Sequence, residues 1–366
     1  MNFATRFQVP LGEFMLDHGG LTDPTKHPHE VFVLYSIPSF DNAKPEYVAG
    51  KDIGSSKKNV EEGDILLSRI VPHIRRCWIV AKHSEGKTLA SSEWIVFRSK
   101  KIHAPYLRHF LVSDAFHQQF MQTVAGVGGS LLRANPRYVA NILIPLPPLD
   151  EQRRIAAILD KADTLRRKRK RALDLLSALN RSVFSWTFGS REAWIRGKNH
   201  ASLFDICSPK QWRTISSEQL LKEGYPVYGA NGKIGYFNEF NHEHETVLIS
   251  CRGATCGTIN ICEPQSYVTG NAMALDDVTN DVNIKYLADA LRVRGVKDAI
   301  TGTAQPQITR QSLGVVTIPI PERKAQDKYV NRVNRLERHI RIAKTSIQKM
   351  DILSSSLQHR AFTGQL

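Results

Sequence analysis

Acidic and basic residues near the start of the chain have the types that a metal-dependent nuclease site needs. Asp64 is followed about twenty residues later by Glu85-Gly86-Lys87. Two carboxylates on adjacent strands can hold a divalent ion against a scissile phosphate, and a lysine can stabilise the developing charge. Such acidic-x-Lys triplets also arise by chance in a chain of this length, and Gly86-Lys87-Thr88 lacks the preceding glycine of a phosphate-binding loop. The spacing alone therefore predicts no nuclease.

Two further patterns are too incomplete to indicate catalysis or metal binding. Asn135-Pro136-Arg137-Tyr138 is similar to the Asn-Pro-Pro-Tyr motif of amino-methyltransferases, but Arg137 replaces the second proline and no glycine-rich strand–loop unit for a methyl donor precedes it. Five residues have zinc-ligand types without any Cys-x-x-Cys pair, namely Cys251, Cys256, Cys262, His242 and His244. We therefore expect no catalytic residue and no metal ion on this chain.

Polar and cationic side chains in loops have the types that read DNA bases. Arginine pairs with guanine, and Asn and Gln pair with adenine, through two parallel hydrogen bonds in the major groove. The candidates in the first half are Lys57, Lys58, Arg69, Arg75, Arg76, Arg98 and Arg133. Those in the second half are Asn231, Lys233, Arg252, Thr255, Asn271, Gln305, Gln307 and Arg310. Each of them has an alternative interpretation as a surface residue or a turn stabiliser.

A scaffold that the chain contains twice must position these candidates. Residues 142–190 and 316–364 align without a gap at an offset of 174. Ile144-Pro145-Leu146-Pro147 corresponds to Ile318-Pro319-Ile320-Pro321, Gln152 to Gln326 and Phe188 to Phe362. A period near half the chain length is too long for a solenoid. One unit, a variable block that ends in a Pro-rich step and a long helix, therefore occurs twice.

Each Pro-rich step precedes roughly 38 residues without Pro or Gly, in which apolar residues are spaced alternately by three and four. This spacing over more than four heptads is typical of a coiled coil. We expect the two helices, each about 57 Å long, to bury each other in an antiparallel pair. Their seam would contain Ile155, Ile158, Leu165, Leu176, Leu179, Val183, Val333, Leu336, Ile340, Ile347, Met350 and Leu357. The alternative is an amphipathic helix that lies on its own domain.

The pattern predicts an α+β protein with a pseudo-twofold internal repeat, in which two α/β domains are separated by two long antiparallel helices. The expected segments are a first domain over 1–141, a Pro-rich step with its helix over 142–190, a second domain over 191–315 and a second step with its helix over 316–366. Strands are expected at 31–37, 64–70, 78–81, 94–97, 226–228, 246–251, 258–262 and 272–275, and helices at 104–122, 284–294 and 296–300. Small-residue and glutamine-containing loops, 126–130 and 302–307, close the two domains.

The charge and composition favour a nucleic-acid-binding protein of the cytoplasm. The chain has a net charge of +15, which indicates a nucleic-acid partner. Ten Lys/Arg against five Asp/Glu lie in 150–189, and ten against four lie in 322–361. The run Arg166–Arg171 could face phosphates, face acidic helices of a partner protein, or form a solvated surface. No apolar run approaches the ~18 residues that span a membrane, residues 1–14 lack a signal-peptide pattern, and five sparse cysteines suggest reduced thiols.

The repeated segments resemble parts of a known family. ILIPLPPLDEQRRIAAILDKAD, at 142–163, is similar to the central conserved region of the specificity subunits of type I restriction–modification systems, and SSSLQHRAFTG, at 354–364, resembles their C-terminal conserved region. Three segments of the second block are similar to sequences in their target-recognition domains, namely YPVYGANGKIGYF, LISCRGATCGTI and GTAQPQIT. The second step reads IPIPERKAQ, where the family more often has a further proline and an acidic pair.

This resemblance implies a non-catalytic subunit that binds double-stranded DNA. Each of two target-recognition domains would read one half of a split sequence, and the helices would bind two methyltransferase subunits, with restriction subunits joining through the complex. S-adenosylmethionine, ATP and Mg would be bound by those partner subunits, and no cofactor by this chain. Because the two blocks differ in sequence, we expect an asymmetric target. The alternatives are a self-contained nuclease or methyltransferase, and a coiled-coil adaptor that does not read DNA.

Overall fold

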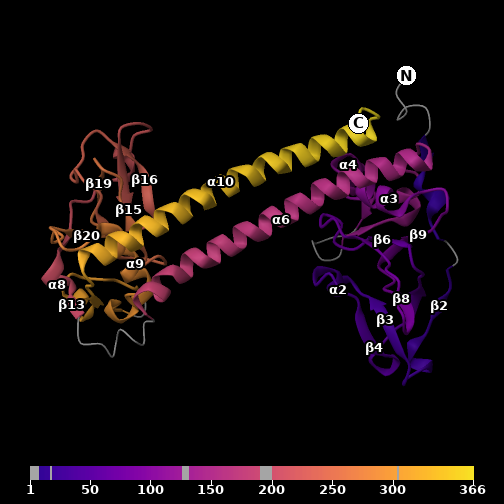
Figure 1. Cartoon of the computed structure of the whole chain (residues 1–366), viewed down its shortest axis with the longest axis horizontal. Helices are drawn as coiled ribbons and strands as arrows, with labels where there is room; N and C mark the ends of the chain where they lie inside the picture. Colours follow the sequence, from indigo (N-terminus) through magenta and orange to yellow (C-terminus); the bar gives the residue numbers. More distant parts are fainter. Residues whose placement is uncertain (1–7, 17–18, 126–131, 190–199, 303–304) are drawn as a thin grey trace. The chain divides into compact units, whose positions relative to one another are not determined.

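The chain forms two compact units in the computed structural model, which describes residues 8–16, 19–125, 132–189, 200–302 and 305–366. The first unit contains residues 1–170 and 345–366, and the second contains residues 171–344 (Figure 1). Each unit therefore combines one block with the start of one long helix and the end of the other. The glycine-rich loop expected at 126–130 lies outside the described residues.

The described residues of the first unit form two main sheets and four short helices. A five-stranded sheet has the order β2-β5-β8-β3-β4, and a three-stranded sheet has the order β7-β6-β9. The strands are β2 (Leu21–Thr22), β3 (Val31–Tyr35), β4 (Glu46–Ala49), β5 (Lys57–Asn59), β6 (Ile65–Ser68), β7 (Cys77–Ile79), β8 (Lys87–Ala90) and β9 (Trp94–Phe97), with a small ladder of β10 (Val124–Ala125) and β11 (Arg133–Ala134). The helices are α2 (Ile37–Asp41), α3 (Ala104–Leu111), α4 (Asp114–Gln122) and α5 (Pro136–Val139).

The second unit has the same kinds of layers in a smaller block. A four-stranded sheet has the order β14-β20-β17-β18, and a three-stranded sheet has the order β16-β15-β19. The strands are β14 (Ser208–Gln211), β15 (Tyr225–Gly229), β16 (Gly232–Phe237), β17 (Val247–Ser250), β18 (Ile259–Ile261), β19 (Tyr267–Val268) and β20 (Ala272–Asp276), and the helices are α8 (Leu203–Ile206) and α9 (Ile284–Arg294).

The three-stranded sheet β7-β6-β9 of the first unit and the four-stranded sheet of the second are buried on both faces. This burial explains the continuous apolar runs in the sequence. Side chains alternate between the two faces of a strand. In β6, Ile65 and Leu67 therefore point into the core beneath α3 and α4, while Leu66 points into the core against the five-stranded sheet. In β17, Val247 and Ile249 likewise face one core and Leu248 faces the other.

Each Pro-rich step forms a short antiparallel ladder with the start of its own block. The strand β12 (Leu143–Pro145) pairs with β1 (Gln8–Pro10), and β21 (Thr317–Pro319) pairs with β13 (His200–Ser202). These two ladders, here called necks, bring the entry and exit of each block together. Proline is tolerated there because the necks are two-stranded and edge positions need no donated amide.

The two long helices have equal length and occupy equivalent positions in the repeat. Helix α6 spans Leu149–Phe188 and α10 spans Arg323–Phe362, 40 residues each. Gly189 and Gly364 follow their ends with positive φ, which is the usual way for a helix to terminate. In the first unit the start of α6 packs with the end of α10, and in the second the end of α6 packs with the start of α10. The predicted antiparallel arrangement is therefore confirmed.

Several local predictions need correction. The helix expected over 104–122 is two helices, because Ser113 caps α4 by accepting a hydrogen bond from the Phe116 amide. The strand expected at 31–37 ends at Tyr35, and Ser36 then caps α2. Residues 296–300 contain only a single 3-10 turn, Lys297–Ala299. Among the described residues, no helix combines the length and apolarity that crossing a bilayer requires.

Candidate nucleic-acid interface and its supporting junctions

The block of the first unit is joined to α6 by a buried glutamine. Gln152 is 1 % exposed, and its Oε1 accepts a hydrogen bond of 2.8 Å from the amide of His103, the residue before α3. Its Nε2 donates to the carbonyl of Pro147 in the Pro-rich step at 2.8 Å. One side chain therefore ties the start of a block helix to the start of a long helix.

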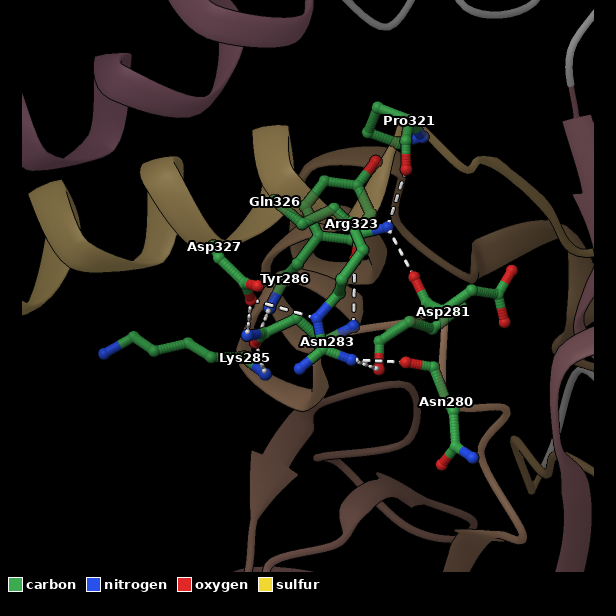
Figure 2. A network of polar contacts seen from close by, with 10 residues as sticks. Asn280, Asp281, Asn283, Lys285, Tyr286, Pro321, Arg323, Gln326 and Asp327 are labelled. Atoms are coloured by element: carbon green, nitrogen blue, oxygen red, sulfur yellow. Dashed lines mark hydrogen bonds and ion pairs between the residues drawn. The ribbon is translucent and has the colours of Figure 1, made fainter.

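The second unit contains the same junction at Gln326, which is drawn in Figure 2. Gln326 is 0 % exposed, its Oε1 accepts from the Asn283 amide at 2.8 Å, and its Nε2 donates to the carbonyls of Pro321 and Asp281. Asn283 also caps α9, because its Oδ1 accepts from the Lys285 amide. The repeated glutamine therefore has the same structural role in both units.

Polar contacts around Gln326 are more extensive than those around Gln152. The Asn283 side-chain amide donates to Asp327, which also accepts from Arg323 at 3.0 Å. The Arg323 guanidinium donates in turn to main-chain carbonyls of the loop before α9 (Figure 2). In the first unit, His103 precedes α3 without any side-chain cap.

Aromatic side chains complete both junctions. The hydroxyl of Tyr106 donates to the Pro145 carbonyl at 2.8 Å, and that of Tyr286 donates to the Pro319 carbonyl at 2.7 Å. Burial raises the pKa of both tyrosines, so both hydroxyls remain protonated donors. Phe362 packs on Tyr106, and Phe188 packs on Tyr286. The last residue of each long helix therefore closes the junction at the start of the other.

The junctions also differ in a buried polar contact between the block helix and the long helix. In the first unit His109 on α3 is fully buried and its Nε2 lies 2.8 Å from Asp160 on α6. Burial lowers the pKa of His109, against the opposing effect of Asp160. In the second unit, Tyr329 on α10 donates to Asp289 on α9 at 2.9 Å.

The residues with nuclease and methyltransferase resemblance have structural roles. Asp64 is 1 % exposed and accepts two hydrogen bonds of 2.6 Å from Arg98, so its carboxylate is neutralised within the core. Lys87 donates to the Thr22 hydroxyl at 2.7 Å. Asn135 is the N-cap of α5, where its Oδ1 accepts from the Arg137 amide at 3.0 Å. This cap explains the Asn-Pro pair without any methyl transfer.

The cysteines and histidines of the second block belong to its packing. Cys251 is 0 % exposed, and burial raises the pKa of its thiol to about 11, whereas a metal ligand is a thiolate. His242 contacts Asp276 through Nε2 at 3.0 Å and Asn241 through Nδ1 at 2.6 Å. Within the described residues, no three His, Cys, Asp or Glu side chains gather in a metal-binding arrangement.

The cationic candidates of the first unit contact other parts of the protein. Four of the arginines pair with carboxylates through Nε: Arg69 and Arg133 with Glu93, Arg76 with Asp41, and Arg98 with Asp64. Arg75 pairs with Asp114 at 2.6 Å. Lys58 donates to the Trp94 carbonyl and Lys57 to Ser55, and burial lowers the pKa of both amines. These side chains are anchored in the folded unit, and no contact with DNA is needed to account for their positions.

Several candidates of the second unit come together in one loop cluster, defined here as residues 229–232, 251–257 and 305–310. Thr255 donates to Asn231 at 2.9 Å, and Arg252 pairs with Gln307 through an isolated main-chain bridge. The Cys251 amide donates to the carbonyl of Asn271. Arg252, Gln305 and Gln307 are exposed. Within the described chain, the Arg252 guanidinium makes no hydrogen bond or ion pair.

Two other candidates of the second unit lie against aromatic rings. The Lys233 amine lies 4.7 Å from the centre of the Tyr236 ring and 3.6 Å from Glu263. The Arg310 guanidinium lies 5.9 Å from the Phe204 ring. Both remain near the surface, but each has an intramolecular contact that Arg252 lacks.

The long helices leave apolar side chains uncovered. In the second unit Trp186 is 78 % exposed, and it lines a groove of about 600 Å³ with Leu179, Ser182, Val183, Arg332, Arg335, Leu336 and His339. At the equivalent positions of the first unit, Leu165 and Leu353 are about half exposed. Leu165 and Leu179 are therefore more accessible than a closed seam predicts, while Leu159, absent from that seam, is 2 % exposed.

Comparison with known proteins identifies the family. The model of the type I restriction modification DNA specificity domain matches the chain twice, over residues 24–175 and 197–351. The chain belongs to this family. The two matches coincide with the two halves of the internal repeat, so this chain carries two specificity domains.

Individual members of the specificity-domain family are distant in sequence. The EcoprrI specificity subunit of Escherichia coli is 25 % identical over 59 % of this chain, and the aligned region spans about half, 54 %, of that relative. The putative MjaX specificity subunit of Methanocaldococcus jannaschii is 21 % identical over 83 % of this chain and 78 % of its own length. A chain solved in a study of complex assembly and conformational transition of the type I R-M system has a TM-score of 0.64 at 21 % identity, with 98 % of each chain covered, and this likeness shows the shared fold.

Some residues of the two junctions repeat in the sequence and could be found from it, and others do not repeat. Gln152 and Gln326 were visible as a repeated pair without an assigned role. Tyr106-Leu107 and Tyr286-Leu287 also repeat, at an offset of 180, but the surrounding block sequences differ too much for that signal to stand out. The contact of His109 with Asp160 has no local sequence signal, because 51 residues separate them.

Proposed function

We propose that this chain is the DNA sequence-specificity subunit of a type I restriction–modification complex and reads a split, asymmetric double-stranded target. The observation that carries this proposal is the pair of specificity domains that share one junction but differ in surface. The glutamine and tyrosine contacts that both junctions share would give the two readers one kind of support, and unlike surfaces would give them unlike half-sites. The chain itself would be non-catalytic, since Asp64 and Asn135 have structural roles.

Base reading in the second unit is assigned to the loop cluster. Phosphate contacts position a protein on DNA, whereas contacts with base edges specify sequence. The exposed Arg252 side chain has no hydrogen bond or ion pair among the described residues, and its main chain bridges to Gln307. Arginine suits guanine and glutamine suits adenine. Loops on a rigid sheet are a suitable place for such contacts because they can vary without changing the core.

Two methyltransferase subunits would dock on the exposed apolar side chains of the long helices. The groove at Trp186 in the second unit and the side chains at Leu165 and Leu353 in the first occupy equivalent positions of the repeat. Two equivalent patches suit two copies of one partner. S-adenosylmethionine would be bound by these methyltransferase subunits, and ATP and Mg by the restriction subunits that join them.

The docking assignment predicts a change in stoichiometry. Trp186→Glu with Leu179→Glu should leave one methyltransferase copy per chain, as should Leu165→Glu with Leu353→Glu, and the four changes together should leave none. Mass photometry of the co-purified complex measures this directly. The matched control is Leu175→Glu, at a residue that is 63 % exposed outside both patches. Retention of two copies by the fourfold variant would contradict the assignment.

The function is tested by mapping methylated bases in the genome of the host with and without this gene. We expect loss of a single split and asymmetric adenine-methylated motif when the gene is deleted. Exchange of residues 1–141 for those of another specificity subunit should alter only one half of the motif. Arg252→Ala should relax the other half. An unchanged methylation pattern in a strain that expresses active methyltransferase subunits would refute the proposal.

A further inference from the structure

The middle of α6 carries a group of cations that neither the junctions nor the apolar patches use. Arg167, Lys168, Arg169 and Lys170 follow one another and are all exposed; they are called here the cationic collar. Successive residues of an α-helix are rotated by about 100°, so these four side chains surround about 300° of the helix. The collar is therefore a ring of positive charge and has no apolar face of its own.

The four cations of the collar have no ion-pair partner within 4 Å among the described residues. The preceding residue, Arg166, pairs with Asp351 on α10. Arg167 makes only a long contact with Thr164, 3.5 Å, on its own helix. Among the described residues, Lys168, Arg169 and Lys170 form no ion pair within 4 Å and no side-chain hydrogen bond. Like charges three and four residues apart on a helix repel, so the collar weakens α6 until a counter-charge arrives.

We propose that the cationic collar binds phosphates of the DNA that separates the two half-sites. This inference rests on the proposed function, because only a reader of a split target leaves a stretch of unread duplex between its recognition loops. Neutralisation of phosphates by Lys and Arg releases counterions and needs no base contact. The collar would hold the unread duplex by charge alone and would add affinity without adding sequence preference.

The chemistry of the collar favours phosphate over an acidic protein surface. Protein interfaces have an apolar core, with charged residues depleted there and a polar rim. The apolar patches at Leu165 and Trp186 meet that description, whereas the four consecutive residues of the collar contain no apolar side chain. Lysine and arginine together, without paired carboxylates, are typical of a sequence-independent phosphate contact.

The test removes the charge of the collar and the charge of the spacer phosphates, separately and together, and measures DNA binding. The full chain, in complex with its methyltransferase subunits, would be titrated with a duplex that contains the motif found by methylation mapping. A second duplex would carry uncharged methylphosphonates across the spacer and normal phosphates elsewhere. The protein variant would combine Arg167→Gln, Lys168→Gln, Arg169→Gln and Lys170→Gln, and binding would be measured by fluorescence anisotropy over a range of salt concentrations.

The expected results follow from counterion release. If two of the four side chains face the duplex, the slope of log K against log[salt] should fall by about 2, and affinity at physiological salt should fall on the order of tenfold for every sequence. The neutral spacer should weaken the wild-type protein similarly but leave the variant unaffected. A charge-preserving control, Arg167→Lys with Lys168→Arg, Arg169→Lys and Lys170→Arg, should bind like the wild type.

Two outcomes would overturn the inference while leaving the proposed function intact. One is motif-specific binding with equal sensitivity of wild type and variant to the neutral spacer. The other is loss of co-purifying methyltransferase in the variant, which would assign the collar to a protein partner. Absence of motif-specific binding by the wild type would instead count against the proposed function itself.

Discussion

The two units attach their blocks to the long helices through the same glutamine contacts, but they present very different surfaces. Gln152 and Gln326 make matching contacts with a block-helix amide and a Pro-rich carbonyl. By contrast, the arginines of the first block are paired with carboxylates, while Arg252 in the second block is exposed. Residue type alone therefore does not identify the side chains that contact DNA bases. An arginine is available for base contacts only where the fold supplies it with no carboxylate.

The strongest way to sharpen this contrast is to remove one arginine of each kind. Arg98→Ala would leave Asp64 buried and unpaired, so we expect the first unit to lose about 3 kcal/mol of unfolding free energy. Arg252→Ala should change stability by less than about 0.5 kcal/mol, since its side chain is exposed. Chemical denaturation measures both changes in stability, and DNA titration measures the loss of base reading expected for Arg252→Ala. Loss of DNA affinity by a stably folded Arg98→Ala protein would place Arg98 among the readers after all.

A smaller effect is expected when the shared junction is broken. Gln152→Leu leaves the His103 amide and the Pro147 carbonyl buried without their partner, which should cost about 2 kcal/mol. Gln326→Leu should cost less, because Asn283 continues to cap α9 with its own side chain. Hydrogen exchange in the first turns of α3 and α9 measures both. Gln348→Leu, at an exposed position of α10, is the control, and equal protection loss in the two junction variants would remove this asymmetry.

The smallest expected difference between the units appears on acidification. Burial holds the pKa of His109 below its ordinary value near 6.5. Between those two pKa values the unfolded chain binds a proton that the folded chain does not, so unfolding free energy falls as the pH decreases through about 6.5. At the corresponding contact, burial raises the pKa of Tyr329, which therefore stays protonated throughout this range.

The measurement for this third prediction is the pH dependence of unfolding of the first unit. His109→Gln should reduce the loss of unfolding free energy between pH 7 and pH 5 by about the contribution of one titrating group. The burial-lowered pKa values of His103 and His117 add to the dependence of the same unit with the same sign. The exposed residue His359 provides the matched control through His359→Gln, and an unchanged profile for His109→Gln would show that its contact with Asp160 is not pH-sensitive.

The scaffold was largely predictable because the chain contains it twice. The presence of two long helices, their antiparallel pairing and the strand β9 at Trp94–Phe97 followed from periodicity and from the offset of 174. Short polar strands such as β5 (Lys57–Asn59) and β8 (Lys87–Ala90) were missed, because three or four residues with charged side chains carry no periodic signal. The family resemblance was confirmed by the two matched specificity domains.

The candidate site was less predictable, for a physical reason. The sequence shows which residues can pair with bases but not which of them already have a partner. Arg98 meets Asp64 across 34 residues, Arg76 meets Asp41 across 35, and Arg133 meets Glu93 across 40. Such ion pairs depend on sheet order, which local patterns do not encode. The assignment of base contacts to Arg252 and Gln307 therefore stays a prediction.

The necks have a consequence for how much the blocks can vary in size. The first neck encloses residues 11–142 and the second encloses residues 203–316. The chain entropy lost on closing a loop grows only with the logarithm of its length, so this difference in size changes the closure cost by about 0.1 kcal/mol. Even a doubled block would add only about 0.6 kcal/mol. The free energy of closing a two-stranded neck therefore depends very little on the length of the block that it encloses. Long insertions between β1 and β12 should leave α6 in place.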